Sequence, residues 1–163
     1  MEIINLYTDG SCLKNPGYGG CACILEYKGN KKELSSGYKL TTNNRMELMA
    51  VIIGLEAIKT KDKKVIIYSD SKYVIDSFDK GWIYNWEREG FYKRTNADLF
   101  IRLLNLYRSF PNIEFSWVKG HNGHEENEKC DVLAVAMSSR NPQTEDTGYL
   151  EQLKNNNHER NTN

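Results

Sequence analysis

The chain has 163 residues, the length of one ordinary domain, with 22 Lys and Arg against 22 Asp and Glu. A net charge of zero argues against a simple nucleic-acid coat protein, which would be basic, but allows an enzyme with an acidic centre. No apolar secretory segment opens the chain, and no run of ~18 apolar residues could span a bilayer. We therefore expect a monomeric cytoplasmic protein with no membrane partner.

The cysteine content gives no sign of a disulfide framework or a zinc site. No two cysteines form a C-x-x-C pair, which indicates reduced thiols of a cytosolic protein. The four residues concerned are Cys12, Cys21, Cys23 and Cys130.

The first forty residues alternate β-forming segments with turn signals. Residues 2–8 predict a buried strand that runs into a turn at Asp9, Gly10 and Ser11. Residues 19–27 and 32–38 predict two further strands, joined by a hairpin signal at Gly29 and Asn30. Together these segments predict a three-stranded antiparallel meander.

Strands and helices alternate through the rest of the chain. Capping residues at 41–44 precede a strong helix, in which apolar residues from Met46 to Leu55 repeat at helical spacing. Strands are predicted at 65–68 and 113–117, and helices at 71–78, 96–107 and 125–138.

The order of these elements implies an α/β fold, a mixed sheet with helices on its faces. We place one domain at residues 1–150. Residues 151–163 form a polar tail that is Asn-rich from Asn155 onward, and we expect it to be disordered.

Four acids occupy positions that suit a shared site: Asp9, Glu47, Asp70 and Asp131. Asp9 and Asp70 follow predicted strands, and ligand sites of α/β sheets lie beyond the carboxyl ends of strands. Glu47 adjoins the buried face of the first helix. Asp131 lies inside the last helix, where Asp is a poor helix former. Each acid alone has an ordinary explanation as a turn residue, a dipole complement or a solvated side chain.

A converging set of four carboxylates has a chemical consequence. Like charges raise one another's pKa values unless a cation is bound. Oxygen ligands of this kind suit Mg²⁺, which Mn²⁺ can replace. Two such ions ~4 Å apart form a common arrangement for phosphodiester hydrolysis. The acids therefore predict a hydrolytic metal centre.

The loop from Gly120 to His124 contains two glycines and two histidines. A zinc site is an alternative for His121 and His124, but no Cys or third His is suitably spaced. A mobile His121 imidazole that moves protons near the metals is the favoured interpretation.

Four blocks of sequence resemble bacterial-type ribonuclease HI, the type 1 ribonuclease H family. The resemblance extends through 126–131 and the late segment 145–149, and covers roughly residues 2–150. Because several independent blocks occur in order, the resemblance is highly specific. The four blocks are 7–11 (YTDGS), 42–48 (TNNRMEL), 68–74 (YSDSKYV) and 117–124 (WVKGHNGH).

The resemblance implies a five-stranded mixed sheet in the order 3-2-1-4-5 and a Mg²⁺-dependent endonuclease for the RNA strand of RNA–DNA hybrids. The products would carry 5′-phosphate and 3′-hydroxyl ends. Asp9 would bridge both metals, Asp131 would complete one metal site, and Glu47 and Asp70 the other. His121 would assist proton transfer and product release. The positions that would touch the hybrid are Cys12, Asn15, Asn43, Asn44 and Lys72, with Thr42 on a DNA phosphate.

The aromatic segment around Trp82 and Trp86 resembles the family's basic protrusion, which binds the DNA strand. The i, i+4 spacing of the two rings also fits a packed cluster, and both interpretations can hold. The segment between Trp86 and residue 99 is shorter than in the well-known bacterial form. Glu87 and Glu89 stand where basic residues are frequent, so we expect weak hybrid binding with a shallow salt dependence.

Two other functions were weighed. An integrase-like nuclease of the same fold would show three acids and no paired-histidine loop. A hybrid- or double-stranded-RNA-binding module without catalysis would not need all four acids.

Overall fold

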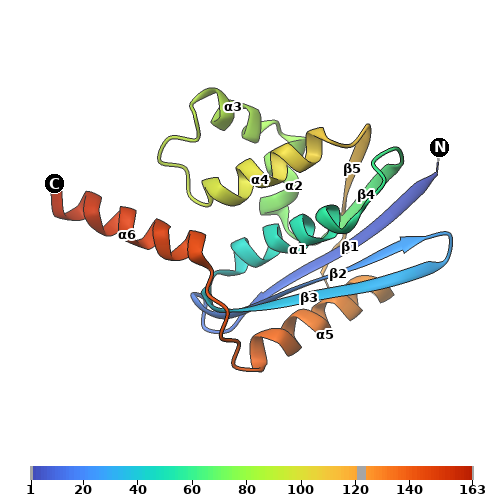
Figure 1. The fold of residues 1–163 in the computed structure, drawn as a ribbon, viewed down its shortest axis with the longest axis horizontal. Coiled ribbons are helices and arrows are strands. Elements are labelled where there is room, and N and C mark those ends of the chain that lie inside the picture. Colours follow the sequence, from blue (N-terminus) through green and yellow to red (C-terminus); the bar gives the residue numbers. More distant parts are fainter. Residues whose placement is uncertain (1, 121–123, 163) are drawn as a thin grey trace.

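A computed structural model describes residues 2–120 and 124–162, and its centre is a five-stranded sheet in the order β3-β2-β1-β4-β5 (Figure 1). The predicted fold and strand order are confirmed. Central strand β1 pairs antiparallel with β2 and parallel with β4, which pairs parallel with β5. The strands are β1 (Ile3–Cys12), β2 (Gly17–Tyr27), β3 (Asn30–Thr41), β4 (Lys64–Ser69) and β5 (Asn112–Trp117).

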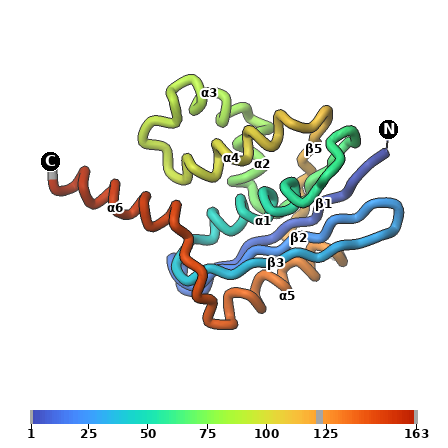
Figure 2. Tube along the Cα trace, viewed as in Figure 1, coloured from blue at the N-terminus to red at the C-terminus, as the bar shows by residue number. Residues whose placement is uncertain are grey.

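Helices cover both faces of the sheet (Figure 1). Helices α1 to α4 lie on one face and α5 on the other, while α6 projects from the end of the molecule (Figure 2). The helices are α1 (Asn43–Ala57), α2 (Lys72–Asp79), α3 (Trp82–Arg88), α4 (Ala97–Arg108), α5 (Glu125–Ser139) and α6 (Thr147–Thr162).

Residues Leu6 to Asp9 of the central strand β1 are all buried, so both faces of the sheet are covered there. Successive side chains point to opposite faces. Leu6 therefore packs in the large core that includes residues of α1, whereas Tyr7 packs with Cys130 and Ala134 of α5. This burial on both faces fixes the position of Asp9, which lies two residues further along β1.

The turn predicted at Asp9 to Ser11 is wrong, because β1 continues to Cys12. Gly10 pairs with Cys21 and Ser11 with Gly20 in the ladder with β2. The glycine that suggested a turn instead allows a helix to approach the strand, as shown below. Strand β3 is likewise longer than predicted and ends at Thr41.

The expected disorder of the tail also differs from the structure, in which α6 runs from Thr147 to Thr162. The first turns of α6 are anchored: Tyr149 is buried, and Gln152 Oε1 accepts a hydrogen bond from Asn96 N at 2.7 Å. Once a first turn is fixed, each further residue adds to a helix at little cost. Composition alone therefore missed the anchoring of this helix. Within the described part of the chain, no helix has the length and apolar character needed to cross a membrane.

Candidate active site

Three of the four predicted acids meet at one edge of the sheet. Asp9, Glu47 and Asp70 each offer an oxygen, and these atoms lie within 4.8 Å of one another. Asp9 lies near the end of β1 and Asp70 follows β4, and the two strands are parallel with Tyr7 opposite Tyr68. Glu47 is contributed by the first turns of α1.

Gly10 brings the end of β1 against the start of α1. Its N–H lies 2.9 Å from Asp9 Oδ1 and 3.2 Å from Glu47 Oε1, and it donates to both carboxylates. A Cβ atom at Gly10 would lie 2.5 Å from Glu47 N and from Met46 C, which are backbone atoms. Only glycine therefore permits the spacing that joins the two acids.

The acids lie in an electrostatically strained environment. Burial, then the charge of Asp70 and a smaller effect of Asp131, raises the pKa of Asp9 to about 7. Burial, followed by the charges of Asp9 and Asp70, raises the pKa of Glu47 well above its ordinary value. Glu47 Oε2 is buried and accepts no hydrogen bond from the described residues. A buried carboxylate oxygen without a donor beside two further acids fits a bound divalent cation.

Asp131 lies on α5, outside the three-acid group. It lines a small cavity of about 20 Å³ that Asp70 also lines. Two contacts tie α5 to the strands below. Cys130 Sγ lies 3.4 Å from Tyr7 O, and Asn127 Nδ2 lies 3.5 Å from Tyr68 O, each as the donor. These contacts set the distance of Asp131 from the acids of β1 and β4.

The two histidines of the glycine-rich loop differ in what the structure describes. His121, the predicted proton-transfer residue, lies outside the described residues. His124 precedes α5, and its ring packs against the rings of Tyr7 and Tyr68, with both centroid distances at 5.6 Å. His124 is therefore a packing residue between sheet and helix.

The predicted substrate contacts of β1, the following loop and α1 come together beside the acids. Asn15 Oδ1 accepts a hydrogen bond from Asn43 N at 3.1 Å, and Cys12 Sγ lies 3.4 Å from Thr41 O. Thr42 caps α1, with its Oγ1 accepting from Arg45 N at 3.2 Å. Asn44 follows in the first turn of α1.

The other predicted contacts lie on α2 and α3. Lys72 begins α2, and its Nζ lies 4.2 Å from the ring centroid of Trp117 at the end of β5. On α3, Trp82 is 41% exposed, and Trp86 packs edge-on against Phe100. The packed-cluster interpretation of the tryptophans thus describes Trp86 better than Trp82.

The acidic residues of α3 have different surroundings. Glu87 makes a two-pronged ion pair with Arg108 of α4, at 2.5 and 2.7 Å. Glu89, which caps the end of α3, is exposed.

Sequence reasoning missed two components of this region. Gly10 resembled a turn residue, although its role is close approach. Arg45 attracts no separate prediction from the sequence, yet it is 1% exposed and paired with Asp98 and Asp146. Burial alone would lower the pKa of Arg45, but the hydrogen bonds to Asp98 and Asp146 raise it. No local pattern distinguishes a buried arginine, so only the tertiary structure reveals it.

A mixed sheet of this order with acids clustered at its edge defines a hydrolase of the ribonuclease H-like class. The RNase H family model matches residues 1–139. Ribonuclease H of Desulforamulus reducens is 50% identical over 145 residues, covering 86% of this chain and 90% of the relative. Ribonuclease HI of Shewanella oneidensis is 47% identical over 154 residues, covering 91% and 96%. The chain belongs to the RNase H family, as a ribonuclease H enzyme of the bacterial HI type.

Solved structures agree with this assignment. LC9-RNase H1, a type 1 RNase H with the type 2 active-site motif, has a TM-score of 0.77 at 29% identity, covering 88% of this chain and 75% of its own. LC11-RNase H1, solved in complex with an RNA/DNA hybrid, has a TM-score of 0.64 at 25% identity, covering 84% of this chain and 97% of its own.

Proposed function

We propose that this enzyme hydrolyses the RNA strand of RNA–DNA hybrids with two divalent ions, normally Mg²⁺, and leaves 5′-phosphate and 3′-hydroxyl ends. The observation that carries the proposal is the group of Asp9, Glu47 and Asp70, whose oxygens lie within 4.8 Å of one another and whose first two members are buried. The family membership and the relative solved with an RNA/DNA hybrid support the substrate.

Each acid has a separate task in the proposal. Asp9 would hold both ions, with Asp131 completing the set for one and Glu47 and Asp70 for the other. Bound divalent ions supply Lewis-acid activation of the attacking water and neutralise charge on the leaving oxygen. The Gly10 N–H fixes the inner oxygens of Asp9 and Glu47, which leaves Glu47 Oε2 directed to a ligand.

His121 is proposed to move protons during product release, because an imidazole titrates near neutral pH. Two described residues that flank it, Gly120 and His124, line the same cavity as Asp70 and Asp131. Mn²⁺ would replace Mg²⁺, since both are hard ions that prefer oxygen ligands.

The contacts with the hybrid are proposed for the residues gathered beside the acids. Recognition of RNA depends on its 2′-hydroxyl, a donor and acceptor that DNA lacks. The amides of Asn15, Asn43 and Asn44 can pair with such groups and with base edges. Thr42 is proposed to hold a DNA phosphate. The remaining proposed contacts with the hybrid are Cys12, Lys72, Trp82 and Trp86. We further propose that the enzyme acts as a cytoplasmic monomer.

The chemistry of the cut ends tests this mechanism. Cleaved RNA should serve as a primer for a polymerase directly, because its 3′ end would be a hydroxyl. Its 5′ end should be ligated without prior treatment by a kinase. Products with a 3′-phosphate or a cyclic phosphate would contradict water as the attacking group.

A further inference from the structure

Arg45 is the most highly bonded buried side chain beside the candidate site. Its Nε and Nη2 donate to Asp146 at 2.8 and 2.9 Å, and its Nη1 and Nη2 donate to Asp98 at 2.8 and 2.7 Å. Nη1 also lies 3.3 Å from Asn96 Oδ1. Two bidentate carboxylates hold the guanidinium in one orientation. The side chain of Arg45, in the first turn of α1, is therefore held in a fixed conformation.

Asp146 holds the chain on both sides of the α1 cap. Besides Arg45, its Oδ2 accepts a hydrogen bond from Thr41 Oγ1 at 2.7 Å, and Thr41 is fully buried. Thr41 ends β3 and Arg45 lies in α1, with Thr42 capping the helix between them. One carboxylate thus fixes both ends of the segment 41–45, which includes the proposed contacts Thr42, Asn43 and Asn44.

The segment that carries Asp146 is itself anchored. Asp146 Oδ1 accepts a hydrogen bond from Tyr149 N at 3.2 Å, and Lys39 N donates to Thr144 O at 2.7 Å. Gly148 lies against the ion pair, because a Cβ atom there would come 2.7 Å from Arg45 Nη2 and closer still to Asp98. The absence of a side chain at Gly148 lets the segment approach the buried guanidinium.

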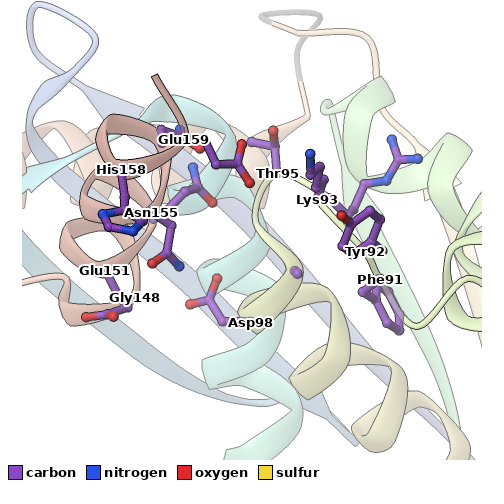
Figure 3. Close-up of a pocket in the computed structure, with 14 residues that line it drawn as sticks. Phe91, Tyr92, Lys93, Thr95, Asp98, Gly148, Glu151, Asn155, His158 and Glu159 are labelled. Carbon is purple, nitrogen blue, oxygen red and sulfur yellow. The ribbon is translucent and has the colours of Figure 1, made fainter. Parts of the chain in front are cut away.

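The hydrogen bonds of Tyr149 and Gln152 lie at the beginning of α6. Beyond it, a pocket of about 560 Å³ separates α6 from residues 91–95, with Asn155 and His158 lining the helix side (Figure 3). The described contacts of the carboxyl-terminal segment with the Arg45 network therefore come from residues 146–152.

We propose that Asp146 is a positioning residue. It acts through Thr41 and Arg45 to hold residues 42–44, the cap and first residues of α1, in the geometry that binds the hybrid. The inference rests on the proposed function, because it assumes that these residues contact the substrate. Asp146 itself touches no reacting group. Its effect is on substrate binding. If residues 42–44 sample several conformations, only a fraction of the molecules can bind the hybrid, and the apparent affinity falls by that fraction.

The hydroxyl of Thr41 gives the cleanest test. Thr41→Val removes the bond to Asp146 but leaves the Asp146 carboxylate paired with Arg45, so the fold should persist. We expect KM for a hybrid to rise about tenfold, the effect of losing one hydrogen bond to a charged group. The value of kcat should change less than twofold. Thr41→Ser, which keeps the hydroxyl, should restore the wild-type KM.

Kinetics at two salt concentrations, together with a matched control, separate positioning from general destabilisation. The proposed Thr42 contact is neutral and releases no counterion, so the log–log salt slope of KM should stay at the wild-type value while KM rises. Ser138→Ala is the matched control, since Ser138 is also a buried hydroxyl but lies on α5 and bonds Val135 O. It should lower the melting temperature without moving KM or the salt slope.

A double variant tests whether Thr41 acts through Asp146. Asp146→Asn with Thr41→Val should raise KM no further than Asp146→Asn alone, because coupled residues are not additive. Should valine not be accommodated, Thr41→Ala removes the same hydroxyl. A folded Thr41 variant with wild-type KM would overturn the positioning role. Failure of the wild-type enzyme to cleave hybrids would instead overturn the proposed function.

Discussion

Asp9 and Glu47 occupy a place where a protein without bound ions loses stability. Both carboxyl groups are buried, at 7% and 4% exposure, beside a third acid. Burial and neighbouring charge raise the pKa of each. The same crowding that disfavours folding creates a site for a divalent cation, so stability and ion binding should be linked.

Asp9→Asn should stabilise the ion-free protein in a pH-dependent manner. The pKa of Asp9 rises from 3.8 to about 7 on folding, so the folded state binds the proton more tightly. Stability of the wild-type chain is then lost as pH rises from about 4 through about 7. The variant should melt several degrees higher at pH 8, since ~1 kcal/mol shifts Tm by about 2–4 °C at this size.

Thermal melts in a chelator at pH 5 and pH 8 measure this effect. The difference between the variant and the wild-type protein should shrink at pH 5 and also shrink when Mg²⁺ is added at pH 8. Equal melting temperatures at pH 8 would show that Asp9 is not destabilised by its neighbours.

Gly10→Ala should separate activity from folding. The added Cβ would meet backbone atoms of α1 at 2.5 Å, so the helix must shift and carry Glu47 with it. We expect a loss of ~1–3 kcal/mol in unfolding free energy and a fall in kcat of about 10² or more, as misplaced catalytic groups produce.

Gly54→Ala in the same helix is the control, because the three atoms nearest to its Cβ would all belong to the side chain of Leu6 in the core. It should change stability but leave kcat near the wild-type value. A Gly10→Ala enzyme with normal kcat would show that the site does not need the close approach of β1 and α1 at this glycine.

At the scale of elements, we expect the charges of α3 and α4 to determine how strongly the shortened protrusion attracts the hybrid. Glu87 neutralises Arg108, which would otherwise be available to a phosphate, and Glu89 is exposed nearby. An exposed ion pair contributes little to stability, so changing its charge should alter binding more than folding.

Glu87→Lys combined with Glu89→Lys should therefore lower KM for long hybrids and steepen its salt dependence, with kcat within a small factor. Each added phosphate contact increases the log–log slope by roughly 0.7–0.9. Kinetics at two salt concentrations provide the measurement. An unchanged KM at low salt would place both side chains away from the substrate.

The contacts of α6 with the Arg45 network and with Asn96 come from its beginning. Removal of residues 153–163 should leave kcat and KM nearly unchanged, because these contacts come from 146–152. Removal of 146–163 should lower stability strongly by exposing the charge of Arg45 without its partner Asp146. Thermal melts and kinetics of the two truncations compare the halves. A raised KM after removal of residues 153–163 alone would contradict the assignment of these contacts to 146–152.

At the scale of the whole molecule, the sequence predicted the sheet order through the family resemblance and the strand pattern through alternation. The acids were recognisable because Asp9 and Asp70 follow strands and Asp131 interrupts a helix pattern. The extension of β1 through Gly10 was not predictable, since a glycine needed for close approach looks like one needed for a turn. The network of Arg45 was missed because it joins residues about 50 and 100 positions apart.

The zero net charge of the chain conceals an uneven distribution. Three of its 22 acids cluster at the edge of the sheet, where they suit a cation rather than a phosphate. In the proposed function, hybrid binding depends on ions at these acids and on the proposed contacts in residues 12–15 and 42–44. We therefore expect cleavage to require divalent ions.

The most direct test is cleavage of one labelled RNA presented in three forms: paired with DNA, paired with RNA and single-stranded. With Mg²⁺, the wild-type enzyme should cut the RNA only when it is paired with DNA, and a chelator should abolish cutting. Asp9→Asn, which stays folded, should show no cleavage of any form. Cleavage of the hybrid by folded Asp9→Asn at a rate near that of the wild-type enzyme would contradict the assignment of the acid cluster as the catalytic centre.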